Sequence, residues 1–143
     1  MPPQALAHLH ARCFTSPPPW SVASFAQLLQ DPGVVLLAAP DDTAFALFRI
    51  VADEAELLTI ATDPVARRRG QARRLIARFE PLARAHGVAK MFLEVAEDNL
   101  AALRLYEECG FSRTGRRPNY YSRANAPAVA ALMLCKSLDA ELT

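Results

Sequence analysis

The chain has 143 residues, of which 52% are hydrophobic and 22% charged, and its formal net charge is +1. This composition excludes a disordered chain and fits one domain, residues 1–143, that buries about two-thirds of its unfolded surface. The near-neutral charge disfavours a dedicated nucleic-acid-binding domain, which usually carries a strong basic excess. No stretch of about 18 apolar residues occurs, so no membrane span is expected.

Cysteine usage and the amino-terminal sequence favour a reducing compartment. The three cysteines, Cys13, Cys109 and Cys135, are odd in number and widely spaced, which argues against a disulfide framework or a zinc site. The first residues, MPPQALAHLHARCF, lack the basic start and apolar run of a signal peptide. We therefore expect a cytoplasmic protein without a metal ion.

Two short helices are predicted at the start of the chain. Residues 3–14 are rich in alanine and leucine, and the sequence TSPPPW then ends the helix because successive prolines lack N–H donors. SVASFAQLLQDPG follows as a second helix, with Ser21 as N-cap and a closing turn at 31–33. By default, His8, His10 and His86 are expected at the surface or at helix ends.

The next segments predict an antiparallel meander of three strands. Residues 34–39, 43–52 and 56–62 are rich in β-branched and apolar side chains, and short acidic turns separate them.

The third helix is predicted to begin near Arg69–Gly70 and to end at Gly87. Pro81 lies inside it and should kink or divide it, at a cost of about 3 kcal/mol before compensation. Six residues share one face at helical spacing: Ala72, Leu75, Ile76, Phe79, Ala83 and His86.

The remaining sequence predicts a strand at 89–95, a helix at 98–110, a polar loop at 116–127 and a final strand at 128–138. No repeat or linker separates domains. The order of elements predicts an α/β or α+β layered fold with a mixed sheet.

The arginine-rich stretch DPVARRRGQARRLIARFE, residues 63–80, admits three interpretations. A helix N-terminus has N–H groups without partners and a favourable dipole, so a strand, a turn and a helix beginning near Gly70 would form an anion site. Glycine allows close backbone approach, and arginine donors suit phosphate oxygens. The alternatives are a solvated basic face and a nucleic-acid-binding helix.

Two downstream side chains carry possible chemistry. Glu94 lies towards the end of an apolar strand, where a carboxylate is costly to bury, and partial desolvation would make it a more effective general base. It could equally be a rim carboxylate paired with an arginine. Tyr106 shares a helical face with Leu100 and Leu103; it is either a core aromatic or a proton donor to a leaving thiolate.

Together these segments resemble the GNAT superfamily of acetyl-CoA-dependent N-acetyltransferases. RRRGQA fits its R/Q-x-x-G-x-G/A signature through Arg67, Gly70 and Ala72, and NLAALRLYEECGF is similar to its N-x-x-A-x-x-L-Y-x-x-x-G-F segment. The segments LEV, LYE and NYY, with PWS at 19–21, further resemble the branch that acetylates the N-terminal alanine of a small-subunit ribosomal protein. The resemblance covers roughly residues 10–136.

The resemblance implies a mostly antiparallel sheet splayed into a V, about four flanking helices, and acetyl-CoA as cosubstrate. The family usually begins with a strand before the first helix; here that strand is either missing or lies upstream. The resemblance implies Glu94 as general base and Tyr106 as general acid. The implied acetyl-CoA-binding residues are Ile60, Ala61, Thr62, Arg67, Arg68, Arg69, Gly70, Gln71, Ala72, Arg73, Asn99 and Tyr106.

For the acceptor, the resemblance implies the N-terminal segment of a ribosomal protein, bound by Trp20, Tyr120 and Tyr121. Arg74 and Arg78 keep the interpretation of a solvated face. A small amine, a polyamine or a lysine is the alternative acceptor, and a non-catalytic acyl-CoA-binding module is a further alternative. We expect a monomer or weak dimer, without direct nucleic-acid or membrane binding.

Overall fold

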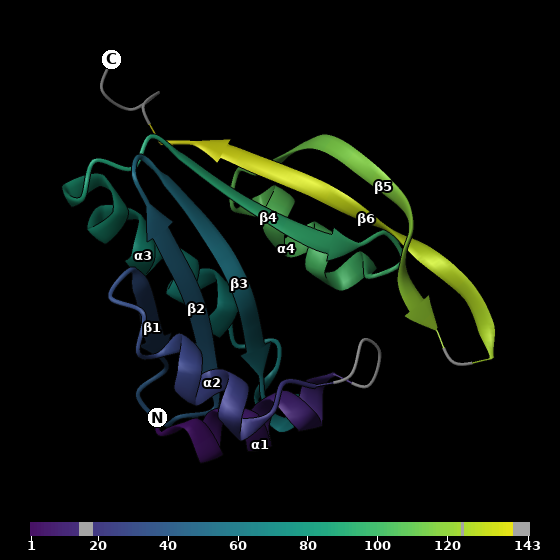
Figure 1. The fold of residues 1–143 in the computed structure, drawn as a ribbon, viewed down its shortest axis with the longest axis horizontal. Coiled ribbons are helices and arrows are strands. Elements are labelled where there is room, and N and C mark those ends of the chain that lie inside the picture. Colours follow the sequence, from purple (N-terminus) through teal and green to yellow (C-terminus); the bar gives the residue numbers. More distant parts are fainter. Residues whose placement is uncertain (15–18, 124, 139–143) are drawn as a thin grey trace.

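The computed structural model describes residues 1–14, 19–123 and 125–138. No helix within these ranges is long and apolar enough to cross a membrane. Along the chain (Figure 1) the elements are α1 (Pro3–Cys13), α2 (Val22–Leu28), β1 (Val34–Ala38), β2 (Ala44–Val51), β3 (Glu54–Thr62), a 3₁₀ turn (Pro64–Ala66), α3 (Gln71–Ala85), β4 (Lys90–Ala96), α4 (Leu100–Glu108), β5 (Ser112–Arg123) and β6 (Ala126–Ser137).

The strands form one six-stranded sheet in the order β1-β2-β3-β4-β6-β5. Only the contact between β3 and β4 is parallel, which confirms the predicted mixed sheet and the meander of its first three strands. Residues of α3 and α4 pack in one hydrophobic cluster with the sheet, whereas α1 and α2 pack in a second cluster. The sheet is therefore covered by different helix pairs on its two faces.

The parallel contact between β3 and β4 is short, and the two strands then separate (Figure 1). Pairing covers only three steps, from Glu54 opposite Lys90 to Glu56 opposite Phe92. Beyond Glu56, β3 continues to Thr62 paired with β2 alone. This separation is the predicted V in the sheet.

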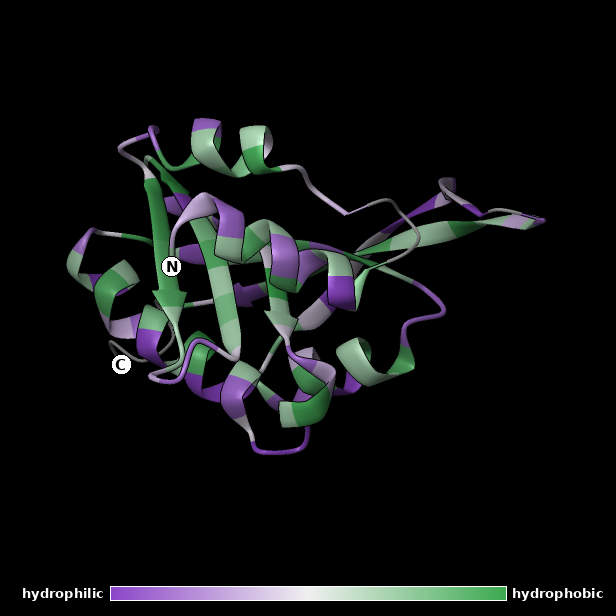
Figure 2. Ribbon diagram, turned by 90° about the horizontal axis from the view of Figure 1, so that it is seen from below, coloured by the Kyte–Doolittle hydropathy of each residue, from purple (hydrophilic) through white to green (hydrophobic). Residues whose placement is uncertain are grey.

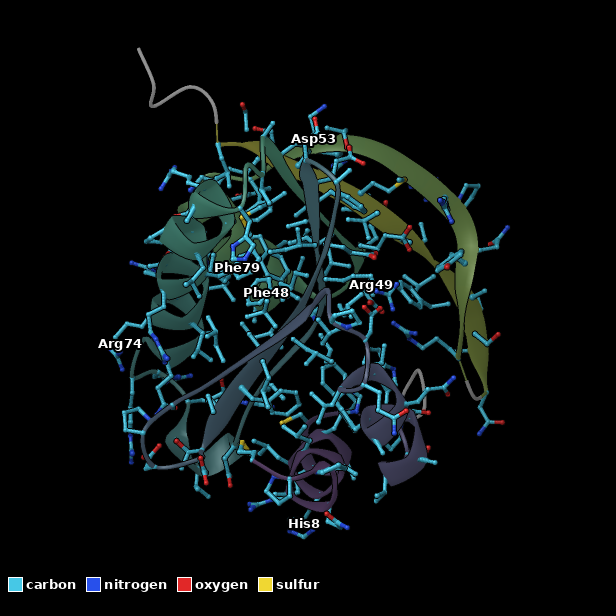
Figure 3. The ribbon with its side chains drawn as sticks, turned by 60° about the vertical axis from the view of Figure 1, so that its left-hand side comes forward. His8, Phe48, Arg49, Asp53, Arg74 and Phe79 are labelled. Carbon is cyan, nitrogen blue, oxygen red and sulfur yellow. The ribbon has the colours of Figure 1, made fainter. Side chains whose placement is uncertain are left out.

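Helix α3 packs on the sheet through the face that its periodicity predicts. Leu75, Ile76 and Phe79 are buried, and the ring of Phe79 stacks on Phe48 of β2 with centroids 3.8 Å apart. Figure 3 shows this pair inside the molecule and Arg74 on the outer side of the helix. Burial of these large side chains stabilises the helix by about 1.5–3 kcal/mol each.

Pro81 does not divide α3, which runs unbroken from Gln71 to Ala85. The proline ring removes the N–H that would have bonded to the carbonyl of Ala77. Residue 77 is exposed, so water can reach its carbonyl. Burial of Phe79 and Ala83 on either side of Pro81 holds the helix together.

The predicted polar loop at 116–127 is wrong. Most of it belongs to β5 and β6, which form a long hairpin that extends from the body (Figure 2). β5 is the edge of the sheet and mostly exposed, so it needs no alternating apolar pattern. Pro118 is tolerated there because it lies where the register with β6 shifts, between Arg117 and Tyr121.

The first element of the chain is α1, and no strand precedes it within residues 1–14. The outer edge of β1 therefore has no strand partner among the described residues.

Candidate active site

A large cleft opens where β3 and β4 separate. Its volume is about 1390 Å³, and its walls come from β3, the turn before α3, β4, α4 and the segment around Trp20. All but one of the predicted site residues line it; Tyr120 is the exception. The structure therefore brings together residues that lie up to a hundred positions apart in the sequence.

The β3 wall offers main-chain groups to the cleft. Beyond Glu56 one edge of β3 has no strand partner, so its N–H and C=O groups there can pair with a ligand in an extended conformation. Leu58 is an extra residue in β3, because Leu57 pairs with Phe48 and Thr59 with the preceding Leu47. Such a bulge bends the strand and re-aims the residues that follow it.

The turn before α3 leaves main-chain N–H groups at the start of the helix without a capping side chain. Gly70 is the N-cap of α3 in the left-handed conformation, with φ of 71°, and no side chain caps the helix. Arg68 is also left-handed, with φ of 69°. The first N–H groups of the helix are consequently available to a ligand, and the helix dipole adds partial positive charge.

Some side chains of this turn have a hydrogen-bond or ion-pair partner in the protein, and others point to solvent. Arg67 donates from Nε to the carbonyl of Thr62 at 3.3 Å, and Gln71 donates to Thr43 Oγ1 at 2.8 Å. Arg73 forms an exposed ion pair with Glu108 of α4; exposed pairs of this kind are weak, so a phosphate could replace the carboxylate. Arg68 and Arg69 are exposed; the pKa of the Asp41 carboxyl is lowered mainly by hydrogen bonds from Thr43, with a smaller contribution from Arg69.

Arg74 and Arg78 of α3 are exposed, as expected. Arg78 also donates to the carbonyl of Ala38 at 2.9 Å, and thereby ties the helix surface to the end of β1.

Glu94 lies on β4 at the wall of the cleft, and its side chain is 25% exposed. Its Oε1 is 3.5 Å from Nη2 of Arg117 on β5. The alternative from sequence, a rim carboxylate paired with an arginine, therefore describes the contact correctly. The pair does not exclude chemistry, because the carboxylate still faces the cleft.

Tyr106 of α4 also lines the cleft; it is buried, 6% exposed, with its ring edge-on to Phe111. Burial, with a smaller contribution from Cys109, raises its pKa above the usual value near 10. The phenol therefore keeps its proton at neutral pH. Asn99 caps α4 by accepting from the N–H of Ala102 at 3.2 Å, which leaves its amide donor for a ligand.

The predicted acceptor residues do not all lie together. Trp20 and Tyr121 line the cleft. Tyr120 is 48% exposed and lies under the guanidinium of Arg117 instead, 5.5 Å from its ring centroid. The rings of Tyr120 and Tyr121 meet edge to face, with centroids 5.1 Å apart, so Tyr120 lies beside a residue of the cleft wall without lining the cleft itself.

Sequence reasoning missed the burial of His10, which it expected at the surface or at a helix end; the residue does lie in the last turn of α1. His10 is 3% exposed and lines the cleft beside Trp20. The signal that was available is the cluster Phe14, Trp20 and Phe25, whose rings surround it.

Comparison with solved structures defines the class of protein. The ribosomal-protein-S18-alanine N-acetyltransferase from Escherichia coli matches with a TM-score of 0.84 and 31% identity, covering 95% of this chain and 87% of that one. Arabidopsis thaliana NAA60 in complex with acetyl-CoA matches with a TM-score of 0.82, covering 96% and 94%; at 17% identity it shows the fold alone. The fold is that of acetyl-CoA-dependent N-acetyltransferases.

Sequence comparison identifies the family. The family model "Acetyltransferase (GNAT) family" matches residues 4–111. The [Ribosomal protein bS18]-alanine N-acetyltransferase of Salmonella typhimurium is 38% identical over 117 residues, which are 80% of this chain and 79% of that protein. The N-alpha-acetyltransferase RimI of Mycobacterium tuberculosis is 36% identical over 132 residues, covering 87% and 82%. The chain belongs to the GNAT family of acetyltransferases and is an acetyl-CoA-dependent N-acetyltransferase.

Proposed function

We propose that this enzyme transfers the acetyl group of acetyl-CoA to the α-amine of a protein N-terminus, with the N-terminal alanine of a small-subunit ribosomal protein as its acceptor. The observation that carries the proposal is the cleft itself, in which an anion-binding turn, an unpaired strand edge, a carboxylate and a buried phenol meet. The acceptor class is supported by the relatives named for ribosomal protein bS18.

The cofactor enters between the separated strands. The pyrophosphate binds the N–H groups of residues 70–73 at the start of α3, with Arg68, Arg69 and Arg73 around it. The pantetheine arm pairs with the free edge of β3 along Ile60–Thr62, and a main-chain N–H there stabilises the oxyanion. The amide donor of Asn99 completes the binding site from α4.

Glu94 acts as the general base. An α-amine has an unperturbed pKa of about 7.7–8.0, so a single well-placed carboxylate, directly or through water, suffices to remove its proton. Arg117 orients the carboxylate from β5, the strand beyond β6 in the sheet.

Tyr106 acts as the general acid. The amine nitrogen attacks the thioester carbonyl, forming the C–N bond, and the C–S bond then breaks. The departing sulfur takes the phenolic proton, which burial of Tyr106 retains at neutral pH. The products are the acetylated amine and CoA, and the phenol is reprotonated from solvent.

Trp20 and Tyr121 form the acceptor wall of the cleft. We propose that residues 1–143 act as one domain, as a monomer or weak dimer in the cytoplasm, without direct contact to nucleic acid.

The experiment is an acceptor screen with acetyl-CoA and mass-spectrometric localisation of the product. The panel contains an alanine-starting peptide of a small-subunit ribosomal protein, the same peptide with a blocked α-amine and a free lysine, and a polyamine. The proposal expects modification of the first peptide alone, at its α-amine. Preferential transfer to lysine or to the polyamine would show that the acceptor is not a protein α-amine. CoA binding without any transfer would favour a non-catalytic module.

A further inference from the structure

Apart from the phenol of Tyr106, His10 is the only polar side chain that is buried among the described residues. Its ring stacks on Phe14 and Trp20, with centroids 4.3 and 5.3 Å apart, and meets Phe25 edge-on at 5.5 Å. An aliphatic side chain would fill this apolar site at lower desolvation cost. The imidazole therefore needs an explanation beyond packing.

Two hydrogen bonds define the state of the ring. The main-chain N–H of Trp20 donates to Nδ1 at 3.1 Å, so Nδ1 carries no proton. Nε2 must then carry it and donate to Thr59 Oγ1, also at 3.1 Å. Burial lowers the pKa of His10 to about 4, which keeps the ring neutral under physiological conditions. With its one lone pair occupied, His10 cannot act as the base for the acceptor amine.

The two partners of His10, Thr59 and Trp20, both lie at the cleft. Thr59 follows the bulge at Leu58 and directly precedes Ile60–Thr62, the strand edge proposed for the cofactor arm. Trp20 lines the cleft and also a second cavity of about 640 Å³ beside α2. His10, Trp20 and Thr59 thus join α1, the segment before α2 and β3 into one wall.

We propose that His10 is a positioning residue for the acceptor: its neutral imidazole fixes Trp20 against Thr59, and so sets the acceptor-side wall of the cleft. This inference rests on the proposed function, since it assigns the wall to the acceptor. Among the described residues, no hydrogen bond or ring contact joins His10 to the phosphate turn or to Glu94, so His10 acts through Trp20 and Thr59 rather than on the reacting atoms.

Four variants separate the two hydrogen bonds. His10→Phe keeps a ring but removes both bonds, and His10→Asn can keep only the bond from Trp20. His10→Gln can keep only the bond to Thr59, and Thr59→Val removes the acceptor at that end without changing size. The matched control is His8→Phe, an exposed histidine two residues earlier on the same helix (Figure 3).

The readouts are KM for the acceptor peptide, kcat, and acetyl-CoA affinity. Trp20 is the only tryptophan of the chain, so its fluorescence also reports on the wall directly, without turnover. Each lost hydrogen bond is expected to raise acceptor KM by about 2–12-fold. His10→Phe should show the largest increase and a shifted Trp20 emission, with kcat and acetyl-CoA affinity changed less than about twofold. His10→Asn, His10→Gln and Thr59→Val should be intermediate, and His8→Phe silent.

A merely structural histidine would lower the melting temperature and the active fraction while leaving acceptor KM unchanged, and that pattern overturns the proposal. If His10→Phe does not fold, an unchanged acceptor KM in Thr59→Val and His10→Asn overturns it equally. Failure of the proposed function is distinguishable, because no protein N-terminus would then be modified by the wild type. In that case the shift of Trp20 fluorescence in His10→Phe still tests whether His10 holds the wall.

Discussion

The two sides of the cleft are built by different means. On the side proposed for the cofactor, the wall is largely main-chain, from the turn at Gly70 and the unpaired edge of β3, with arginine side chains around the turn. On the acceptor side they are side chains, with Trp20 held by His10 and Tyr121 presented by the hairpin. A main-chain site needs only a glycine and a helix start, whereas a side-chain wall depends on contacts between distant elements.

This difference predicts how each side responds to substitution. The cofactor side should be sensitive to backbone conformation and tolerant of changes to single arginines. The acceptor side should be sensitive to individual side chains. Glu94, the proposed general base, should respond to substitution without altering binding on either side.

The largest effect is expected at Glu94, where the two sides meet. Replacing the carboxylate with an amide, Glu94→Gln, removes the base and should lower kcat by about 10²–10⁴-fold. Acetyl-CoA affinity from calorimetry should stay the same. Glu97→Gln is the control, because Glu97 is an exposed carboxylate three residues on, paired with Arg116 at 2.6 Å outside the cleft. Normal turnover in Glu94→Gln would remove this residue from the mechanism.

A second prediction concerns the pH dependence of stability on the acceptor side. His10 titrates near 4 in the folded chain and near its ordinary 6.5 when unfolded, so between these values the unfolded state binds more protons. The free energy of unfolding therefore falls as pH drops from 6.5 to 4, by about 3 kcal/mol from this residue. Denaturant unfolding of wild type and His10→Phe at pH 7 and pH 4 measures it. Equal losses in both proteins would show that His10 is not the titrating group.

The third prediction tests whether the cofactor side depends on its backbone. Gly70 has φ of 71°, where a β-branched residue is strained by about 1–3 kcal/mol. Gly70→Val should therefore weaken acetyl-CoA binding by about tenfold or more in calorimetry.

Two controls accompany Gly70→Val. Gly87→Val imposes similar strain at the other end of α3, where φ is 79° and no atom lies within 4 Å of the added Cβ. Arg78→Ala removes a charge from the same helix. Both should bind acetyl-CoA with nearly unchanged affinity, and weaker binding in Arg78→Ala than in Gly70→Val would show that charge rather than backbone holds the cofactor.

The smallest effect separates two neighbouring tyrosines. Tyr121 lines the cleft and Tyr120 does not. Tyr121→Ala should raise acceptor KM by about 3–10-fold through lost aromatic contact, while Tyr120→Ala changes it less than about twofold. Equal increases of acceptor KM in the two variants would show that the acceptor contacts Tyr120 as well as Tyr121.

The sequence predicts the cofactor side better than the acceptor side, and the reason is local chemistry. Gly70 and the helix that follows it are readable because a strand, a glycine and an amphipathic helix stand next to each other in the chain. The separation of β3 from β4 is implied only by the family resemblance, since no local pattern encodes where a parallel pairing ends.

The acceptor side depends on long-range contacts that periodicity does not report. β5 carries no apolar alternation because it is an exposed edge, so its polar sequence is typical of a loop. The burial of His10 depends on Trp20, ten residues along the chain, and on Thr59, forty-nine residues away. Pro81 gives an error of the opposite kind: the local sequence predicts a kink or a division of the helix, but burial of Phe79 and Ala83 keeps the helix unbroken.

The most direct test of the account is the affinity of a bisubstrate analogue, in which CoA is joined through an acetyl bridge to the α-amine of an alanine-starting peptide. A matched analogue carries the bridge on a lysine side chain. If the cleft holds cofactor and protein N-terminus together, the α-amine analogue should bind at least about 10²-fold more tightly than CoA alone, and the lysine analogue should gain little. Equal affinity of the α-amine analogue and CoA, or tighter binding of the lysine analogue, would contradict it.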